Sequence, residues 1–232
     1  MKKICNSLFI LLVLLSIISC DNYMDVHKEY FKGEIIYAPK PISVQFLAGR
    51  ERVGFRCVLD KSPNVRFIQL IWNNNVDTLN LPVNPSAEME IISTFIPNLR
   101  EASYTFKVRT IDLNGNVSLF LTNVGTAYGD IYESTLVPRV FLSAAYGILD
   151  KAPRIYMKDI DSRMANLIQT EIRYHTTAGG SGIALILPDE SNIIIPDAEK
   201  ASSFEYRSLY IPEALAVDTF ATAWETASFP PL

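Results

Sequence analysis

Histidine, cysteine and tryptophan are scarce in this chain, with two, three and two among its 232 residues. His27 lies in a polar N-terminal segment and His175 near a predicted hairpin, which does not favour a histidine-rich metal site. The sequence also lacks a nucleophile elbow, a zinc-protease motif and a phosphate-binding loop. We therefore predict no catalytic residue, no metal site and no cofactor, and we interpret the protein as not being an enzyme.

Positive charge is limited too. The 21 lysines and arginines are outnumbered by 25 acidic residues, which gives a formal net charge of −4. Without a stripe of lysines and arginines, nucleic acid is an unfavourable partner, and we predict none. The N-terminal apolar run, Leu8–Ile18, is about half as long as the roughly 20 residues that a membrane-spanning helix needs. Its length is typical of the hydrophobic region of a secretory signal.

The residues around this run have the pattern of a bacterial lipoprotein signal. Lys2 and Lys3 precede it, and Ile17-Ile18-Ser19-Cys20 follows it, as in a lipobox where the signal is cleaved and the cysteine acylated. The alternative is an uncleaved signal with an incidental cysteine. We predict a signal peptide over residues 1–19 and lipidation of Cys20.

A polar tether over residues 20–37 would then join the lipid to the folded protein. More than one acyl chain on Cys20 makes membrane attachment stable, so we predict a lipid-anchored protein of the outer membrane, displayed on the cell surface. Asp21, next to the cysteine, leaves retention at the inner membrane open. Cys5 is lost with the signal, so Cys57 is the remaining thiol; no internal disulfide is possible, and we predict a buried side chain.

Alternating apolar residues predict β-strands after the tether. Residues 52–59 and 104–110 alternate clearly, and residues 65–72 are apolar on both faces, which is typical of a central strand ending at a buried Trp72. Turn signals such as Asn73-Asn74-Asn75 and Asn114-Gly115 separate the strands. About seven short strands without helical periodicity predict a β-sandwich over residues 38–127.

The segment Leu99-Arg100-Glu101-Ala102-Ser103-Tyr104 has the pattern of a tyrosine corner, in which a tyrosine hydroxyl bonds nearby backbone. Together with the strand over residues 104–110 and the turn over residues 114–118, it resembles the final hairpin of fibronectin type III domains. We therefore expect the first sandwich to be fibronectin type III-like, which is an immunoglobulin-like fold.

The second half repeats features of the first. Ile96-Pro97 followed by the Tyr104 strand has a counterpart in Ile195-Pro196 followed by Phe204. Because Phe204 stands at the corner position, the corner hydroxyl is either absent or supplied by Tyr206. A repeat of about a hundred residues indicates a duplicated domain rather than a solenoid, and the alternative is chance similarity between two strand-rich sequences. The predicted fold is all-β, with a second sandwich over residues 128–232.

Further segments carry a family resemblance that covers nearly the whole mature chain: residues 33–37 (GEIIY), 71–73 (IWN), 206–213 (YRSLYIPE) and 217–220 (VDTF). They resemble a family of Bacteroidetes-type lipoproteins of unknown function. The resemblance implies a fold and a location rather than an activity. Proteins of this family resemble accessory components of glycan-uptake systems.

Two functions follow as hypotheses. In the first, the chain is a surface-anchored, non-catalytic binding or accessory module of a glycan-uptake system, with glycan or outer-membrane transport proteins as partners. The candidate ligand-binding residues are Trp224, Tyr128 and Tyr132. The alternative for all three, which the sequence favours, is a structural role, with the two tyrosines packed between the domains. In the second, the chain is a structural spacer or protein-docking scaffold without a small-molecule ligand.

Overall fold

The computed structural model describes residues 36–84 and 88–231. The predicted signal peptide and Cys20 lie outside the described residues, and residues 38–232 form one compact unit. Strands dominate it, with short helical turns at α3 (Asp130–Ser134), η1 (Asn73–Asn75) and η2 (Ser162–Met164). No helix in the described part of the chain has the length and apolar character needed to cross a bilayer.

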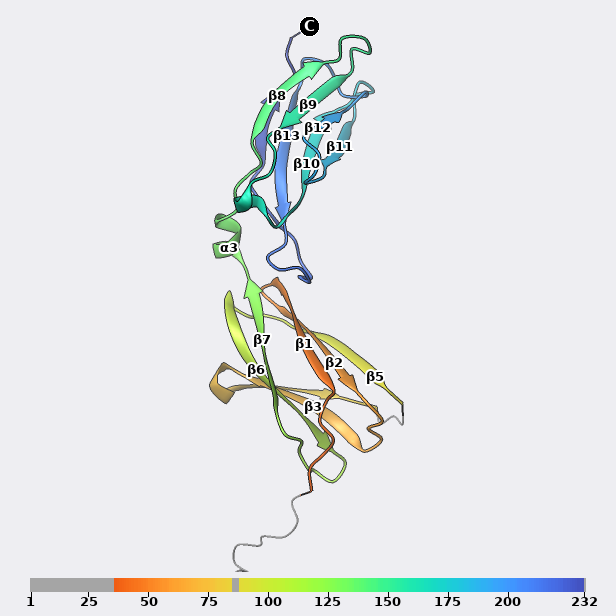
Figure 1. Ribbon diagram of the computed structural model, residues 1–232, viewed down its shortest axis with the longest axis vertical. Helices are drawn as coiled ribbons and strands as arrows, with labels where there is room; N and C mark the ends of the chain where they lie inside the picture. The colour runs from red at the N-terminus through yellow and green to blue at the C-terminus, as the bar shows by residue number, and fades with distance from the viewer. Residues whose placement is uncertain (1–35, 85–87, 232) are drawn as a thin grey trace, which may run out of the picture. The chain divides into compact units, whose positions relative to one another are not determined.

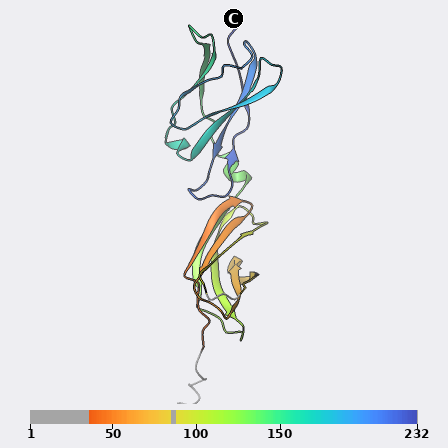
Figure 2. The same ribbon diagram turned by 90° about the vertical axis from the view of Figure 1, so that its right-hand side faces the viewer.

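The first sandwich contains seven strands: β1 (Ser43–Arg50), β2 (Val53–Leu59), β3 (Val65–Trp72), β4 (Asp77–Pro82), β5 (Glu90–Ile96), β6 (Ala102–Asp112) and β7 (Leu121–Tyr128). One sheet has the antiparallel order β1-β2-β5 and the other the order β4-β3-β6-β7 (Figures 1 and 2). A short parallel pairing of β1 with β7 joins the sheets at one end. This connectivity is that of a fibronectin type III-like sandwich.

The second sandwich uses the same order with later strands: β8 (Phe141–Tyr146), β9 (Pro153–Met157), β10 (Leu167–His175), β11 (Ser181–Ile186), β12 (Asn192–Ile194), β13 (Ser203–Tyr210), β14 (Phe220–Ala221) and β15 (Glu225–Ser228). One sheet runs β8-β9-β12, and the other runs β11-β10-β13 (Figure 1). The final strand is split, so that β14 and β15 pair with opposite ends of β13. The predicted all-β fold with two tandem sandwiches is confirmed.

The first core follows from the alternation in β2. Val53, Phe55, Cys57 and Leu59 point inward and are at most 1% exposed. They pack against β3 and β6, where Phe106 is fully buried and stacks on the ring of Phe46 with 4.3 Å between centroids. Burial of Cys57, predicted from the sequence, is confirmed. Desolvation raises the pKa of its thiol to about 12, so it is not a reactive nucleophile.

The tyrosine corner is present in the first sandwich. The hydroxyl of Tyr104 donates to the carbonyl oxygen of Arg100 at 2.9 Å, which ties the start of β6 to the connection before it. The prediction made for Tyr104 is therefore confirmed.

Removing this hydroxyl is expected to weaken the first sandwich modestly. Tyr104→Phe keeps the ring but loses one hydrogen bond, which should lower the free energy of unfolding by about 0.5–1.5 kcal/mol in urea denaturation. Tyr156→Phe is the control, because its hydroxyl makes no hydrogen bond within the described residues. Equal losses in the two variants would contradict a specific role for the corner.

The second sandwich secures the equivalent connection with a different residue. Phe204 is buried, and the hydroxyl of Tyr206 bonds Glu225 of β15 instead of the connection. Tyr146 of β8 takes this place: its hydroxyl accepts from the backbone N–H of Ala201 at 2.8 Å and donates to the carbonyl of Pro230 at 2.9 Å. Tyr206 therefore does not supply the corner bond that the sequence left open for it.

Arg139 is the largest buried charged side chain in the second sandwich, at 1% exposed. Its guanidinium donates to three backbone carbonyls, those of Lys158 (2.8 Å), Leu187 (3.1 Å) and Glu190 (2.5 Å). The backbone N–H of Arg139 also donates to the hydroxyl of Ser208. One side chain thus joins its own segment to the segment at Lys158 and to the turn that contains Leu187 and Glu190.

Candidate functional site

Two of the predicted ligand residues lie together where the sandwiches meet. Tyr128 ends β7 and Tyr132 lies in α3; their ring centroids are 4.9 Å apart, and both rings pack edge-on against Phe220 of β14. The Tyr128 hydroxyl donates to Glu213 at 3.0 Å. Burial, with the Glu213 carboxylate beside it, raises the pKa of Tyr128 to about 12. This arrangement suits packing between sandwiches, and ligand binding by these rings stays a prediction.

Two ion pairs surround this cluster. Arg50 forms two hydrogen bonds with Glu133, at 2.9 and 2.7 Å, and Arg52 forms two with Asp218, at 2.8 and 2.6 Å. The N–H of Val217 also donates to the carbonyl of Ala48 at 2.7 Å. We call the aromatic cluster, the ion pairs and this backbone bond the junction. Both ion pairs connect the two sandwiches: Arg50 ends β1 and Arg52 follows it, whereas Glu133 and Asp218 come after β7 in the chain.

The junction is expected to weaken in acid. The hydrogen bond from Arg52 lowers the pKa of Asp218 below its ordinary 3.8, and that from Arg50 lowers the pKa of Glu133 below 4.5. A carboxylate whose pKa is lower in the folded than in the unfolded protein contributes its full stabilisation of the fold at pH values above its ordinary pKa. This stabilisation is lost as the pH falls through the lowered pKa of the folded protein.

Asp218→Asn should therefore lower the free energy of unfolding at pH 7 by about 1 kcal/mol or less. The difference from wild type should shrink toward zero as the pH falls through the lowered pKa of Asp218, as measured by denaturation at several pH values. Asp189→Asn, an exposed acid outside the junction, is the control. A difference for Asp218→Asn that is independent of pH would argue against the ion pair.

Trp224, the third predicted residue, lies apart from the two tyrosines, just before β15. The guanidinium carbons of Arg173 and Arg207 lie 4.2 and 4.6 Å from the centroid of its ring. These arginines also pair with acids on the same sheet, Arg173 with Glu205 and Arg207 with Glu171. A sugar that stacked on the indole would compete with cations already placed there. Sugar binding at Trp224 stays a prediction.

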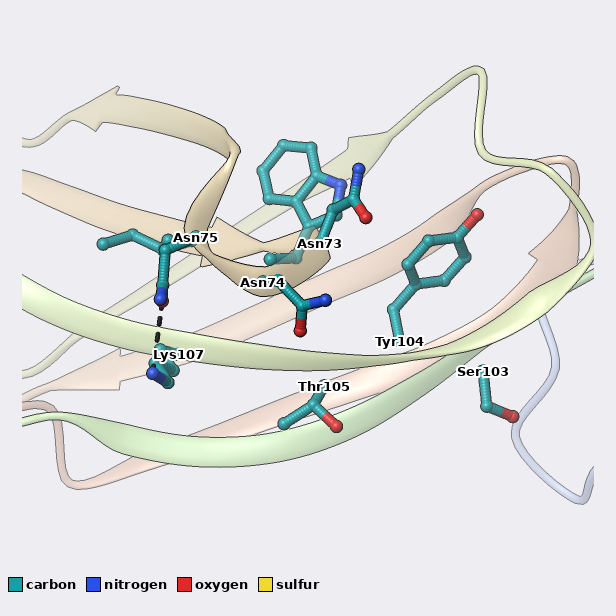
Figure 3. A pocket seen from close by; sticks show the side chains of 9 residues that line it. Asn73, Asn74, Asn75, Ser103, Tyr104, Thr105 and Lys107 are labelled. Atoms are coloured by element: carbon teal, nitrogen blue, oxygen red, sulfur yellow. Dashed lines mark hydrogen bonds between the residues drawn. The ribbon is translucent and has the colours of Figure 1, made fainter.

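A different group of residues lines a surface cavity that the sequence did not single out as a site. The cavity has a volume of about 570 Å³ and lies beside the turn between β3 and β4 (Figure 3). Its lining side chains come from the end of β3, the turn and the start of β6: Ile71, Trp72, Asn73, Asn74, Asn75, Ser103, Tyr104, Thr105 and Lys107. We call it the turn pocket.

The turn itself has an unusual backbone. Asn73, Asn74 and Asn75 all have left-handed φ values, of 49°, 53° and 68°. Asparagine tolerates this region better than most residues, but a run of three is strained and needs support from its surroundings. Such strain is often found at binding sites.

Side-chain bonds hold the two ends of the turn. The amide of Asn73 donates to Asp77 at 3.1 Å, and the ammonium of Lys107 donates to the amide oxygen of Asn75 at 3.1 Å (Figure 3). The central amide, of Asn74, is exposed and makes no hydrogen bond within the described residues. The turn therefore presents one free amide between two fixed ones.

The floor of the turn pocket is an open part of β6. The last pair between β3 and β6 is Ile71 with Lys107, whereas β6 continues back to Ala102 and pairs there with β7 alone. Residues 102–106 thus have an edge without a strand neighbour in the described structure, and the asparagine turn lies across from it (Figure 3). The half-buried rings of Trp72 and Tyr104 complete the wall.

The chemistry of the turn pocket suits the binding of a polar ligand. It offers amides, hydroxyls, two aromatic rings and one ammonium group, and no carboxylate lines it. Its size lies within the range of about 300–1,000 Å³ that is typical of small-molecule sites. Within residues 36–84 and 88–231, no group of three or more potential metal-ligating acids, histidines or cysteines comes together.

Fold and site together describe a pair of fibronectin type III-like sandwiches of a type that is typically non-catalytic. Among solved structures, the chain is similar to the FN1–FN3 domains of chicken CNTN1, with 11% identity, a TM-score of 0.44 and coverage of 83% of this chain and 66% of that one, just under two thirds. It is also similar to the fibronectin(III)-like modules of Clostridium thermocellum CbhA, with 9% identity, a TM-score of 0.40 and coverage of 82% and 94%.

No curated protein matches the chain. The profile of DUF4998, described as a domain of unknown function, matches residues 20–220. The chain therefore belongs to the DUF4998 family, and that description names no enzymatic activity.

Proposed function

We propose that this protein is a non-catalytic, lipid-anchored glycan-binding module that serves a glycan-uptake system at the outer membrane of a Bacteroidetes-type bacterium. The turn pocket is the observation that carries the proposal. Sugars bind where a flat ring faces their C–H groups while amides and hydroxyls bond their oxygens, and the turn pocket supplies both kinds of group within one cavity.

Two features of the turn pocket prepare it for such a ligand. The turn is fixed at both ends by side-chain bonds, so Asn74 is presented without a large loss of conformational freedom on binding. The unpaired edge at residues 102–106 adds backbone donors and acceptors that lie next to the rings.

Glycan binding is tested with the detergent-solubilised full chain on a glycan array. Asn74→Gly removes the free amide while glycine accepts the left-handed backbone, so the fold should persist and affinity should fall about tenfold or more. Asn114→Gly is the matched control, an exposed turn asparagine outside the turn pocket. Binding that is unchanged in Asn74→Gly, or no binding to any glycan, would overturn the proposal.

The lipid anchor rests on the lipobox at Ile17–Cys20. Mass spectrometry of the N-terminal peptide should find acyl chains on Cys20, and Cys20→Ala should move the protein from the membrane to the soluble fraction. An unmodified thiol at Cys20 in membrane-associated protein would contradict the anchor.

The junction favours a second candidate function, a structural spacer or protein-docking scaffold. Two doubly hydrogen-bonded ion pairs and an aromatic cluster restrict bending between the sandwiches, as a spacer requires. Co-purification of an outer-membrane transporter by a protein that binds no glycan would favour this function over the first.

A further inference from the structure

We infer, on the basis of the proposed function, that the protein selects negatively charged sugars, which lie across the outer face of the β4-β3-β6-β7 sheet with one end in the turn pocket. The anionic group, a carboxylate or a sulfate, is held by Lys107 and Arg109. The observations are the strand register, the charges on this face and the partners of the two cations.

The strand register places a defined set of side chains on this face. Phe106 and Val108 of β6 are buried in the core, so their neighbours Lys107 and Arg109 point outward. Cross-strand partners share a face, and Lys107 pairs with Ile71 of β3 and Thr122 of β7. The outward residues of the four strands are therefore Thr78, Asn80, Pro82, Phe67, Gln69, Ile71, Ser103, Thr105, Lys107, Arg109, Ile111, Thr122, Val124 and Thr126.

Lys107 and Arg109 give this face positive charge, the guanidinium of Arg66 lies over its Phe67 ring, and none of its outward residues is acidic, although the chain as a whole has a net charge of −4. Its polar groups are otherwise neutral amides and hydroxyls, which suit sugar hydroxyls. An anionic ligand would meet no repelling carboxylate on the whole described face.

The two cations are also free of carboxylate partners within the described structure. Lys107 donates to the neutral amide of Asn75, and Arg109 donates to the amide oxygen of Gln69 at 2.7 Å. Gln69 in turn donates to Asn80 at 3.0 Å, so a chain of neutral groups holds Arg109 in place. Arg50 and Arg52, by contrast, are already paired with acids.

Glycan suits this face better than nucleic acid. Lys107, Arg109 and Arg66, set among threonines and amides, fall short of the lysine–arginine stripe that a phosphate backbone requires. The turn pocket and the free amide of Asn74 lie at the end of β3, beside Lys107 of this face. One sugar unit can enter the pocket there and reach the rings of Trp72 and Tyr104, which lie on the core side of their strands.

The test is affinity electrophoresis of the detergent-solubilised full chain in gels that contain polygalacturonate, dextran sulfate or neutral dextran, with a DNA oligonucleotide as a competitor. We expect retardation by a charged polymer, and the polymer that retards identifies the anionic group. Lys107→Gln should weaken this binding about tenfold, as expected for one lost charge-assisted hydrogen bond, and Arg109→Gln should add to the loss. Lys107→Arg should largely restore affinity, and Lys200→Gln, in the second sandwich, should leave it unchanged.

The outcomes separate the two proposals. Equal binding of neutral and charged polymers, or charged-polymer binding that Lys107→Gln does not alter, overturns the preference for anionic sugars while glycan binding stands. Competition by the oligonucleotide at equal concentration overturns glycan as the ligand of this face. Loss of binding to every polymer and to the glycan array overturns the proposed function and this inference with it.

Discussion

Arg139→Met is expected to lower the free energy of unfolding of the second sandwich by at least about 3 kcal/mol. Methionine fills much of the space but cannot donate, so three partly buried carbonyls, on Lys158, Leu187 and Glu190, lose their partner together. Each unsatisfied buried polar group costs about 1–3 kcal/mol, and partial entry of water keeps the sum near the lower end. Urea denaturation, followed by circular dichroism, measures the change.

The control is Arg163→Met, which removes an arginine whose side chain is 64% exposed and pairs with the neighbouring Asp161. Surface pairs of this kind contribute about 0–1 kcal/mol. A loss for Arg139→Met no larger than that of the control would show that the three segments are held together by other contacts.

Phe106→Ala is expected to lower the free energy of unfolding of the first sandwich by about 3–5 kcal/mol. The ring is fully buried and contacts three others: Phe46 at 4.3 Å, Trp72 at 5.7 Å and Tyr104 at 6.1 Å between centroids. Alanine leaves a cavity among rigid rings that cannot collapse fully, so both burial and contact energy are lost. The same denaturation experiment measures it.

Phe120→Ala provides the comparison, since its ring is 44% exposed and lies against Arg109. We expect a loss below about 1 kcal/mol there. Because Phe106 also supports Trp72 and Tyr104, its replacement should weaken glycan binding as well as stability. If Phe106→Ala lowered the free energy of unfolding by less than about 1 kcal/mol, the result would contradict the packing described for this sandwich.

Local patterns predicted those parts of the fold that depend on neighbouring residues. Alternation in residues 52–59 identified the inner face of β2, including Cys57, because side chains of a strand alternate strictly between core and solvent. The tyrosine corner was predictable because its hydrogen bond spans only four residues, from Tyr104 to Arg100. The duplicated fold was likewise visible in repeated strand patterns.

The second corner was not predictable for the opposite reason. Tyr146 reaches Ala201 from a strand far away in the sequence, and nothing around Phe204 announces this replacement. The surroundings of Trp224 depend in the same way on β10 and β13, which bring Arg173 and Arg207 to its ring.

The turn pocket shows the same limit at the candidate site. The asparagine triplet correctly predicted a turn, but its left-handed backbone and its position beside β6 depend on where the pairing of β3 with β6 stops. Trp72, expected to be buried, is half-buried because the sheet ends there. The sequence signal that could have pointed to the turn pocket is a tryptophan at the end of a strand followed by three asparagines.

Tryptophan fluorescence gives the most direct test of glycan binding at the turn pocket. The chain has two tryptophans, so Trp224→Phe leaves Trp72 as the single indole. Titration with the glycan that wild-type protein binds most tightly should produce a saturable change in emission from this variant and none from Trp72→Phe. A change seen only in Trp72→Phe, where Trp224 is the reporter, would place the ligand on the second sandwich and contradict the assignment.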